Sequence, residues 1–456
     1  MENSISIGME RIQRLIDQDS FVEINSSYRL PNSVFGYQDV SIEGEGVVTG
    51  FGTIGGKKVC IAAQSVDRLG ASFSIGQARK ILEIMENAEK SGVPMIFLWD
   101  SEGARAQEGP NAVHAYSMVM KKMAELSGVI PILSVVLGKL MGSAAFMTSL
   151  SDFTLMTKKG SELGLKSDKV VRVAFSLPDD VDVNDADNNA EEGTCHIVCE
   201  DEEDAFAQLK RLLKCIPSNN LEDTYIFEND DSIYRKTTGG DLFELVKNSA
   251  DGEVFFELQK GYGWNLHIGF VSYGGLVAGV IMNEPGKPIS KHDAKKAARF
   301  IYFLDAYHIP IISFVDNDGS DLSHNQSSLK AMSKMIYAYG EATAPMISII
   351  AGRAIGDGYT AMSNKANGAD IVYAFKDARI GAMDEDLGSL ILFDGRNDKQ
   401  EEYAKAFLST ETAAQQGLID KVIDPSDLRF EIIKALDIVI NKRVDTHSKK
   451  HGILPL

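Results

Sequence analysis

Two short turns of small residues are the part of this sequence that suggests chemistry. In each, an apolar stretch passes through glycines into residues with helical spacing: ILSVVLGKLMGSAAFM at 132–147 and ISIIAGRAIGDGYTAM at 347–362. The first N–H groups of a helix have no acceptor within it and lie at the positive end of its dipole. Two such amides can hold an oxygen that becomes negative during a reaction. Each turn is therefore a predicted oxyanion hole, with tight helix–strand packing as the alternative for either turn alone.

Side chains that commonly act as acids, bases or nucleophiles show no motif. The eight histidines form no cluster with metal-ligand spacing. There is no G-x-S-x-G elbow, no P-loop, and no G-x-G-x-x-G after a predicted strand. If the protein is an enzyme, we expect it to hold enolates with backbone donors while a substrate or cofactor supplies the reactive groups.

The sequence repeats itself once along its length. A predicted hairpin at 47–63 matches one at 267–283, and the helix–break–strand pattern at 78–103 matches 294–319. The offsets are 219 from Gly50 to Gly269, 216 from Asp100 to Asp316, and 214 from Gly138 to Gly352. We interpret this order and spacing as an internal duplication; two unrelated α/β domains are the alternative.

The repeat predicts the domain organisation. Each half alternates strands and helices, which is typical of an α/β domain with a central sheet. We expect an N-terminal domain at 1–216, a linker at 217–241 and a C-terminal domain at 242–456. An acidic segment at 179–204 holds twelve Asp or Glu residues and no Lys or Arg. We expect that segment to be a solvated insertion or loop, with a metal site or partner-docking surface as alternatives.

Charge and composition exclude several classes of function. The 456 residues carry a formal net charge of −19 without a basic run, which argues against nucleic-acid binding. No apolar stretch is long enough for a membrane helix, and the first residues lack the pattern of a signal peptide. Four scattered cysteines do not suggest a disulfide framework. These features together predict a cytoplasmic protein without direct membrane insertion.

The order of the motifs resembles the carboxyltransferase subunit of biotin-dependent acyl-CoA carboxylases and decarboxylases. These are the propionyl-CoA and methylmalonyl-CoA group of the crotonase superfamily. The resemblance covers nearly the whole chain and is most specific at DSEGARAQEG (100–109), close to the family's Asp-Ser-x-Gly-Ala-Arg-x-Gln-Glu-Gly. Further matches are GSAAFMTSLSDFTLM (142–156), ARFIYFLDAYHIPIISFVD (298–316), YAYGEATAP (337–345) and KKHGILPL (449–456). It implies an α/β fold of two tandem crotonase-like (ClpP/crotonase) ββα-superhelix domains.

The resemblance also implies a reaction and partners. A carboxyl group would move between biotin on a separate carrier protein and a short-chain acyl-CoA, with no protein base and no metal. The partners implied are the biotin carrier protein and either a biotin carboxylase or a membrane decarboxylase subunit. The family usually assembles as a hexamer, a trimer of dimers, in which the N-half of one subunit and the C-half of another form each site.

Carried over residue by residue, the family's motifs give candidate site residues. Amides of Gly142 and Ser143 would hold the thioester oxygen, and amides of Asp357 and Gly358 the biotin ureido oxygen. The acyl-CoA groove would be lined by Gly70, Ala71, Ser72, Lys80, Gly103, Ala104 and Arg105, and the biotin side by Gly356, Tyr359 and Met383.

The departures from the family lie mainly on the biotin side. The usual Pro-Gly-Phe-x-x-Gly after Asp316 is replaced by NDGSDLSHN, and the usual Gly-Gly-Ala-Tyr by GDGY (356–359). They motivate a second hypothesis, a non-catalytic or regulatory subunit of the same fold. A third is a crotonase-type hydratase or hydrolase with Glu102 or Glu108 as its carboxylate. The direction of transfer and the acyl group stay open.

Overall fold

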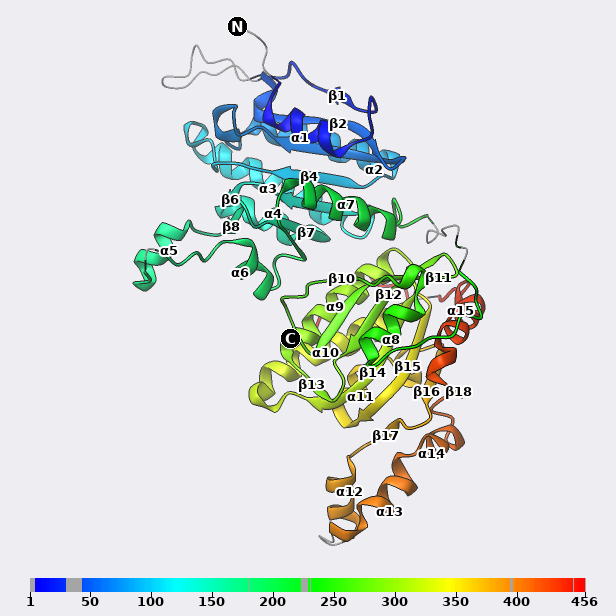
Figure 1. Ribbon diagram of the computed structural model, residues 1–456. Helices are drawn as coiled ribbons and strands as arrows, with labels where there is room; N and C mark the ends of the chain where they lie inside the picture. The colour runs from blue at the N-terminus through cyan, green and yellow to red at the C-terminus, as the bar shows by residue number, and fades with distance from the viewer. Residues whose placement is uncertain are drawn as a thin grey trace. The chain divides into compact units, whose positions relative to one another are not determined.

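The chain divides into two compact units, residues 1–222 and 223–456. Figure 1 shows the computed structural model. It describes residues 5–29, 43–178, 180–222, 229, 231–393, 397–445 and 447–455. Each unit is a sheet covered by helices, as the duplicated α/β pattern predicts.

Unit 1 is built on a seven-stranded sheet in the order β1-β2-β3-β4-β5-β7-β9. Strands β2 and β3 form an antiparallel hairpin. From β3 onward the neighbouring strands β3, β4, β5, β7 and β9 run parallel to one another. Strands β6 and β8 form a separate parallel pair outside this sheet. The strands are β1 (Val22–Ile24), β2 (Val47–Ile54), β3 (Lys57–Gln64), β4 (Met95–Trp99), β5 (Ile132–Val136), β6 (Lys139–Met141), β7 (Phe153–Thr157), β8 (Glu162–Gly164) and β9 (Ile197–Cys199).

Unit 2 repeats this plan. Its sheet has the order β10-β11-β12-β14-β15-β16-β18, with β13 paired to β14 and β17 paired to β15. The antiparallel strands are β10 to β12, and those that follow are parallel. The strands are β10 (Phe256–Leu258), β11 (Leu266–Tyr273), β12 (Leu276–Asn283), β13 (Lys287–Ile289), β14 (Ile311–Ser320), β15 (Met346–Ile355), β16 (Ile371–Phe375), β17 (Arg379–Gly381) and β18 (Lys421–Ile423).

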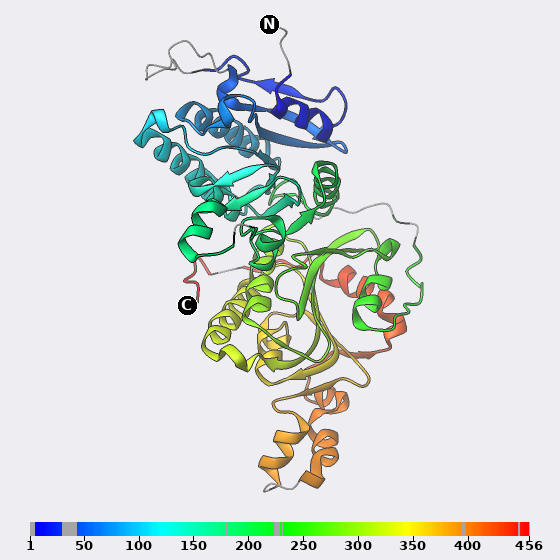
Figure 2. The same cartoon turned by 60° about the vertical axis from the view of Figure 1, so that its left-hand side comes forward.

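Helices cover the sheets because apolar residues alternate between their two faces. In unit 2, Phe270 on β11 packs edge-on against Phe300 of α9, at 5.3 Å between ring centroids. The next residue, Val271, belongs to the core shared with α8 and α15 (Figure 1). The helices are α1 (Ile7–Leu15), α2 (Ile75–Ser91), α3 (Pro110–Leu126), α4 (Ala145–Ser149), α5 (Asp168–Phe175), α6 (Ala186–Glu191), α7 (Glu202–Cys215), α8 (Leu242–Ser249), α9 (Lys291–Ala306), α10 (Asn325–Glu341), α11 (Gly356–Ala361), α12 (Glu385–Leu392), α13 (Gln400–Tyr403), α14 (Thr410–Gln415) and α15 (Leu428–Val439). Helices α12 and α13 project from the sheet of unit 2 (Figure 2).

In each unit, an aspartate carboxylate binds the two glycine amides of the hairpin turn. Asp17 accepts hydrogen bonds from the Gly55 and Gly56 amides, both at 2.9 Å. Asp251 accepts from the matching turn of unit 2, at 3.1 and 2.8 Å from Gly274 and Gly275. The repeat therefore extends to side chains that lie outside the motifs read from the sequence.

The matched glycines Gly50 and Gly269 also have one explanation. A Cβ at either position would lie 2.4 Å from a carbonyl oxygen of the neighbouring strand, that of Val22 or of Phe256. Only glycine permits this approach of an edge strand. The sequence match at this offset thus marks a shared structural requirement.

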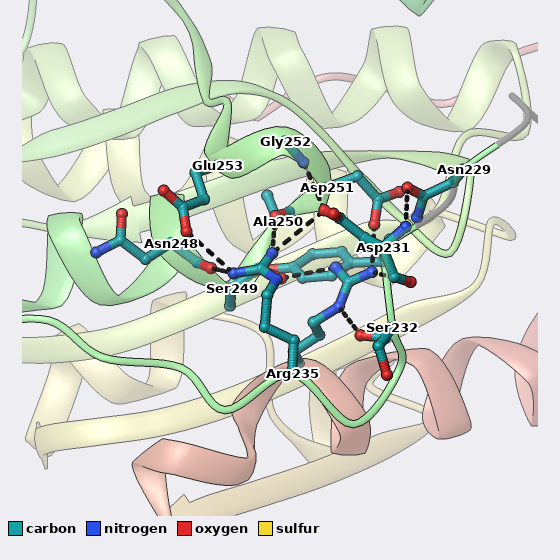
Figure 3. Close-up of polar contacts among 12 residues, drawn as sticks. Asn229, Asp231, Ser232, Arg235, Asn248, Ser249, Ala250, Asp251, Gly252 and Glu253 are labelled. Carbon is teal, nitrogen blue, oxygen red and sulfur yellow. Dashed lines mark hydrogen bonds and ion pairs between the residues drawn. The ribbon is translucent and has the colours of Figure 1, made fainter.

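Both described ends of the predicted linker, 217–241, are attached to a unit. On one side, Asn219 donates to the Gly92 carbonyl of unit 1 at 2.8 Å. On the other side, Arg235 donates to the carbonyls of Asn248 and Ala250, both at 2.6 Å (Figure 3). Arg429 of α15, which is fully buried, bonds the Ser232 carbonyl at 3.0 Å. Residues 231–241 are thus part of unit 2, so the attached segments extend well into the range expected to be a linker.

The acidic segment 179–204 was expected to be a solvated insertion or loop. Apart from Asp179, which lies outside the described residues, it contains α6, β9 and the start of α7, so it is not a loop. Strand β9 is the last strand of the unit 1 sheet. Several of the carboxylates serve structure. Asp185 caps α6, and Glu202 accepts from Arg11 and Arg14 of α1 at 2.7 Å each. The negative charge is therefore partly compensated within unit 1.

No helix in the described part of the chain combines the length and the apolar character required to cross a membrane.

Candidate functional site

In unit 1, three loops that carry predicted site residues leave the sheet at one edge. They follow β3, β4 and β5, which run parallel and are neighbours, so their carboxyl ends meet. In open α/β sheets this is the edge at which ligands bind. The loops are residues 65–74, 100–109 and 137–144.

The third of these loops carries the first predicted oxyanion turn. The chain continues from β6 into the 3₁₀ turn η4 (Gly142–Ala144) and then into α4. Gly142 has φ of +68°, and a Cβ there would meet no atom within 4 Å. Among the described residues, no acceptor takes the Ser143 N–H. The turn therefore presents an amide beside open space, as an oxyanion hole requires.

The first and second loops are joined by backbone hydrogen bonds. Phe73 and Gly103 share a bond of 2.8 Å, from amide to carbonyl, and Arg105 donates back to the Phe73 carbonyl at 2.8 Å. The Glu102 amide donates to the Gly70 carbonyl at 2.9 Å. Predicted groove residues from two distant parts of the sequence therefore lie side by side.

Gly70, Ala71, Ser72, Gly103 and Ala104 all lie on these two joined loops. Gly70 has φ of +60° and Gly103 has φ of +114°, conformations that favour glycine. Ala71 is fully buried, whereas Ala104 is exposed and Ser72 is half-buried. Ala71 therefore contributes backbone rather than side chain to this edge of the sheet.

Lys80 and Arg105, which are predicted to line the acyl-CoA groove, both have buried side chains. The Lys80 side chain is buried, with 1% exposed, and donates to the carbonyls of Gly44 and Val47 at 3.1 and 2.6 Å. Burial lowers the pKa of this lysine to about 8. Arg105 is also buried and pairs with Glu45 at 2.7 Å. Both cations are therefore bound by groups inside unit 1: Lys80 by backbone carbonyls and Arg105 by the Glu45 carboxylate.

Glu45 is a central residue of this region that the motifs did not single out. Its carboxylate accepts from Arg105 and, at 3.0 Å, from the hydroxyl of Ser74, the N-cap of α2. A Cβ on Gly76 would lie 2.5 Å from the Glu45 carboxyl carbon, so the carboxylate is packed against the first turn of α2. It therefore joins the DSEGAR loop to the positive end of that helix.

Gln77 extends these contacts to the sheet. Its amide nitrogen donates to the Glu45 carbonyl at 3.1 Å, and its oxygen accepts from Gln64 at 2.9 Å. Gln64 in turn accepts from the Asp100 amide at 3.0 Å. All these side chains are buried. The chain of bonds fixes the positions at which β3 and β4 pass into their loops.

The second predicted oxyanion turn lies in unit 2, where β15 passes directly into α11. Gly356 begins this helix with φ of +57°. Within the described residues the amides of Asp357 and Gly358 have no acceptor. The turn therefore has the same strand–glycine–helix form as the turn at Gly142.

The surroundings of this second turn differ from those of the first. A Cβ on Gly358 would lie 2.0 Å from Oδ1 of Asn317, so the glycine is packed against the extended end of β14. Asp357 is exposed, and its carboxylate accepts hydrogen bonds from the amide of Ser320, at 3.1 Å, and from its hydroxyl. Asn317 and Ser320 belong to the stretch that departs from the family's pattern, and here they brace the turn.

Tyr359 and Met383, the other residues predicted on the biotin side, lie near this turn. Tyr359 is the fourth residue of α11, and burial raises the pKa of its hydroxyl to about 12. Met383 follows β17, whose Gly381 pairs with Ile355 at the start of the turn. A Cβ on Gly356 would meet the Ala382 carbonyl at 3.2 Å. The structure thus brings 356–359 and 382–383 together within unit 2.

The two candidate carboxylates of the hydratase hypothesis have different surroundings. Glu108 accepts from the Ile75 amide at 2.8 Å, at the start of α2, and lies 3.7 Å from Arg105. Glu102 is exposed, and no basic group in the described chain forms an ion pair with it. Of the two, Glu102 is the exposed carboxylate without an ion pair among the described residues.

No group of three or more His, Cys, Asp or Glu side chains among the described residues is arranged to hold a metal ion.

The chain consists of two crotonase-like α/β units in tandem. In each unit a parallel strand leads into a glycine turn, and this arrangement defines the class of this protein. It belongs to the carboxyl transferase family: the model for the carboxyl transferase domain matches residues 6–454.

Named relatives cover nearly the whole chain. Methylmalonyl-CoA decarboxylase subunit alpha of Veillonella parvula is 33% identical over 472 residues, covering 98% of this chain and 92% of the relative. The methylmalonyl-CoA carboxyltransferase 12S subunit of Propionibacterium freudenreichii subsp. shermanii is 32% identical, covering 98% and 91%. The crystal structure of a transcarboxylase 12S hexamer with bound methylmalonyl-CoA has a TM-score of 0.94 and 32% identity, covering 98% of this chain and 92% of that one. The predicted fold and family are confirmed.

Proposed function

We propose that this protein transfers a carboxyl group between biotin on a carrier protein and a short-chain acyl-CoA of the propionyl-CoA and methylmalonyl-CoA type. The observation that carries the proposal is the pair of strand–glycine–helix turns with unengaged amides in a chain of the carboxyl transferase family. The relatives named for methylmalonyl-CoA support the choice of acyl group.

In unit 1, the amides of Gly142 and Ser143 would hold the thioester oxygen of the acyl-CoA. Removal of the α-proton, or loss of the carboxyl group, places negative charge on that oxygen. Amides fixed beforehand stabilise this charge without reorganisation during the reaction. The joined loops with Gly70, Ser72, Gly103 and Ala104 would position the CoA thioester, while Glu45 and Arg105 hold those loops in place.

In unit 2, the amides of Asp357 and Gly358 would hold the ureido oxygen of biotin, with Gly356, Tyr359 and Met383 around it. Biotin supplies the ureido group from which the carboxyl group is transferred. The donor set fits this oxygen, since both amides lack an acceptor among the described residues. Ser320 holds the Asp357 carboxylate to one side, which reduces its repulsion of a developing negative charge.

Partners and assembly follow from the same proposal. The solved transcarboxylase 12S is a hexamer by its description. We propose that this chain also forms a homo-oligomer, as a trimer of dimers. It would act with a biotin carrier protein and either a biotin carboxylase or a membrane decarboxylase subunit.

The experiment follows labelled carboxyl transfer from methylmalonyl-CoA to free biotin or to a biotinylated carrier. Ser143→Pro removes the amide donor, and proline is tolerated near the start of a helix. Ser143→Ala is the matched control, because it keeps the amide. Proline should lower kcat on the order of a hundredfold or more, as loss of an oxyanion donor does. Equal activities of the two folded variants would contradict the proposed hole.

A second candidate function is hydration or hydrolysis of an acyl-CoA, favoured by the unpaired Glu102 carboxylate at the same edge. Enoyl-CoA and simple thioesters would be the substrates. Turnover of these substrates, with no exchange of labelled carboxyl groups, would replace the first proposal with this one.

A further inference from the structure

Glu102 occupies the variable position of the DSEGAR motif and puts a negative charge at the acyl-CoA edge of unit 1. Resting on the function proposed above, we propose that Glu102 determines acyl-group specificity. Its carboxylate disfavours an acyl group that carries a carboxylate of its own. The site therefore holds a neutral acyl-CoA more tightly than the corresponding α-carboxylated acyl-CoA.

The backbone of Glu102 is fixed on both sides. Its own amide donates to the Gly70 carbonyl at 2.9 Å. The hydroxyl of the preceding residue, Ser101, donates to the Ala71 carbonyl at 2.9 Å, and the Ser101 amide donates to Lys139 at 2.8 Å. The following residue, Gly103, bonds Phe73 at 2.8 Å. With its neighbours held in this way, the side chain leaves the loop in a set direction.

That direction leads over Gly70. An ideal Cβ on Gly70 would lie 2.5 Å from Oε2 of Glu102 and 3.0 Å from its Cγ. The Glu102 side chain thus fills the space that a side chain at position 70 would take. Gly70 lies on the predicted acyl-CoA groove, and Lys139, bonded to Ser101, is three residues before Gly142. The carboxylate therefore lies over the groove loop at Gly70, on a segment whose backbone is bonded to the strand that leads to the first predicted oxyanion turn.

The charge of Glu102 is not compensated by the nearby cations. Arg105 is directed to Glu45 and to Ser72, and Lys80 is directed to backbone carbonyls inside the unit. Within the described residues, Glu102 forms no ion pair, and its side chain is exposed. The neighbouring Glu108 shows the contrast, since it is bound by an α2 amide. Glu102 therefore presents an unpaired negative charge to any bound acyl group.

Like charges a few ångströms apart at a partly solvated site repel one another measurably. At an effective dielectric constant between those of water and protein, the expected preference is on the order of tenfold. The effect should weaken in high salt, because the site is open to solvent. The neutral acyl-CoA, which carries no charge at that end, should be indifferent to Glu102.

The test compares Glu102→Gln with wild type in equilibrium binding of propionyl-CoA and methylmalonyl-CoA. We expect the glutamine variant to bind methylmalonyl-CoA about tenfold more tightly. Its affinity for propionyl-CoA should stay within about twofold, since Coulomb repulsion needs a second charge. Glu125→Gln, at the far end of α3, makes the same charge change away from the loops and should alter neither value.

An unchanged affinity ratio in Glu102→Gln would overturn the inference. So would loss of α-proton exchange from propionyl-CoA without a change in the ratio, because Glu102 would then be a base. If wild type binds neither ester, the proposed function itself fails and the inference fails with it. Binding of both esters with an unchanged ratio rejects only the role of Glu102.

Discussion

Lys80 and Lys296 occupy equivalent positions in the two repeats, each on the second turn of the helix that follows a hairpin. Both are almost completely buried, with 1% and 3% of the residue exposed. Within the part of the chain that the structure describes, each ammonium group donates to backbone carbonyls alone. The Lys80 acceptors are Gly44 and Val47, and the Lys296 acceptors are Gln259, Tyr262 and Gly263. The duplicated fold therefore keeps a buried lysine at the matching position of each unit, where it holds the chain that leads into the hairpin.

These lysines predict a pH dependence of stability. Burial lowers the pKa of each to about 8, from an ordinary 10.5. Between these values the unfolded chain binds a proton that the folded chain releases, so the free energy of unfolding rises with pH across this window. Lys80→Met should reduce the rise and, by leaving carbonyls unsatisfied, lower stability at pH 7. Urea unfolding from pH 7 to pH 10 measures both; an unchanged slope would contradict the first.

The buried pair of Glu45 and Arg105 predicts a large loss on removal of one partner. Glu45→Ala leaves the arginine buried without its counter-ion, which should cost about 3–5 kcal/mol. Glu45→Gln keeps the shape and an acceptor and should cost less. The double variant Glu45→Ala with Arg105→Met should recover part of the loss, as measured by a denaturant double-mutant cycle. Additive losses would show that the pair does not interact.

The two predicted oxyanion turns should respond differently to an added methyl group. Gly142→Ala meets only backbone strain, about 1 kcal/mol, because no atom lies within 4 Å of the new Cβ. It should fold but bind acyl-CoA more weakly, because the methyl group enters the open space. Gly358→Ala meets Asn317 and the Gly319 backbone and should cost about 1–3 kcal/mol of stability. Thermal unfolding and CoA binding separate these outcomes.

His267 predicts a second pH effect in unit 2. Burial opposes its protonation, but hydrogen bonds with Glu257 at 2.7 Å and Glu284 at 3.0 Å outweigh burial and raise its pKa. Lys296 acts in the opposite direction. The stabilisation is complete below the ordinary value of 6.5 and is lost as pH rises through the raised pKa. His267→Gln should remove this decline in stability above pH 6.5, as urea unfolding at increasing pH would measure; a parallel decline in both proteins would contradict it.

Much of the fold could be predicted because its signals are local. The hairpins at 47–63 and 267–283 contain Gly-Gly turns between apolar strands, and these became β2–β3 and β11–β12. The break before Ile309 and the apolar run after it likewise correspond to the end of α9 and strand β14. Their repetition at nearly constant spacing identified the two units. Local patterns suffice where neighbours in sequence decide the conformation.

The roles of individual side chains were harder to predict, because they depend on contacts between distant segments. Lys80 and Arg105 are charged residues in a motif, and nothing in the sequence showed that backbone carbonyls and Glu45 would engage them. The stretch 317–320 departs from the family's pattern, and the sequence alone assigned it no role. The structure instead extends β14 there and lets Ser320 hold Asp357. The acidic segment was likewise expected to be a solvated insertion or loop, since its many charges gave no indication of the short strand β9.

The equivalent aspartates that bind the two hairpin turns have a consequence for which substitutions this protein can accept. Asp17 and Asp251 each secure a turn from within their own unit, without help from the ligand loops at the other ends of the strands. Substitutions that alter one of these loops should therefore leave the sheet and hairpin of that unit intact. The sheet and hairpin are thus stabilised independently of the loops. This is consistent with the family motif near Gly142 being retained while its counterpart near Gly358 has a different sequence.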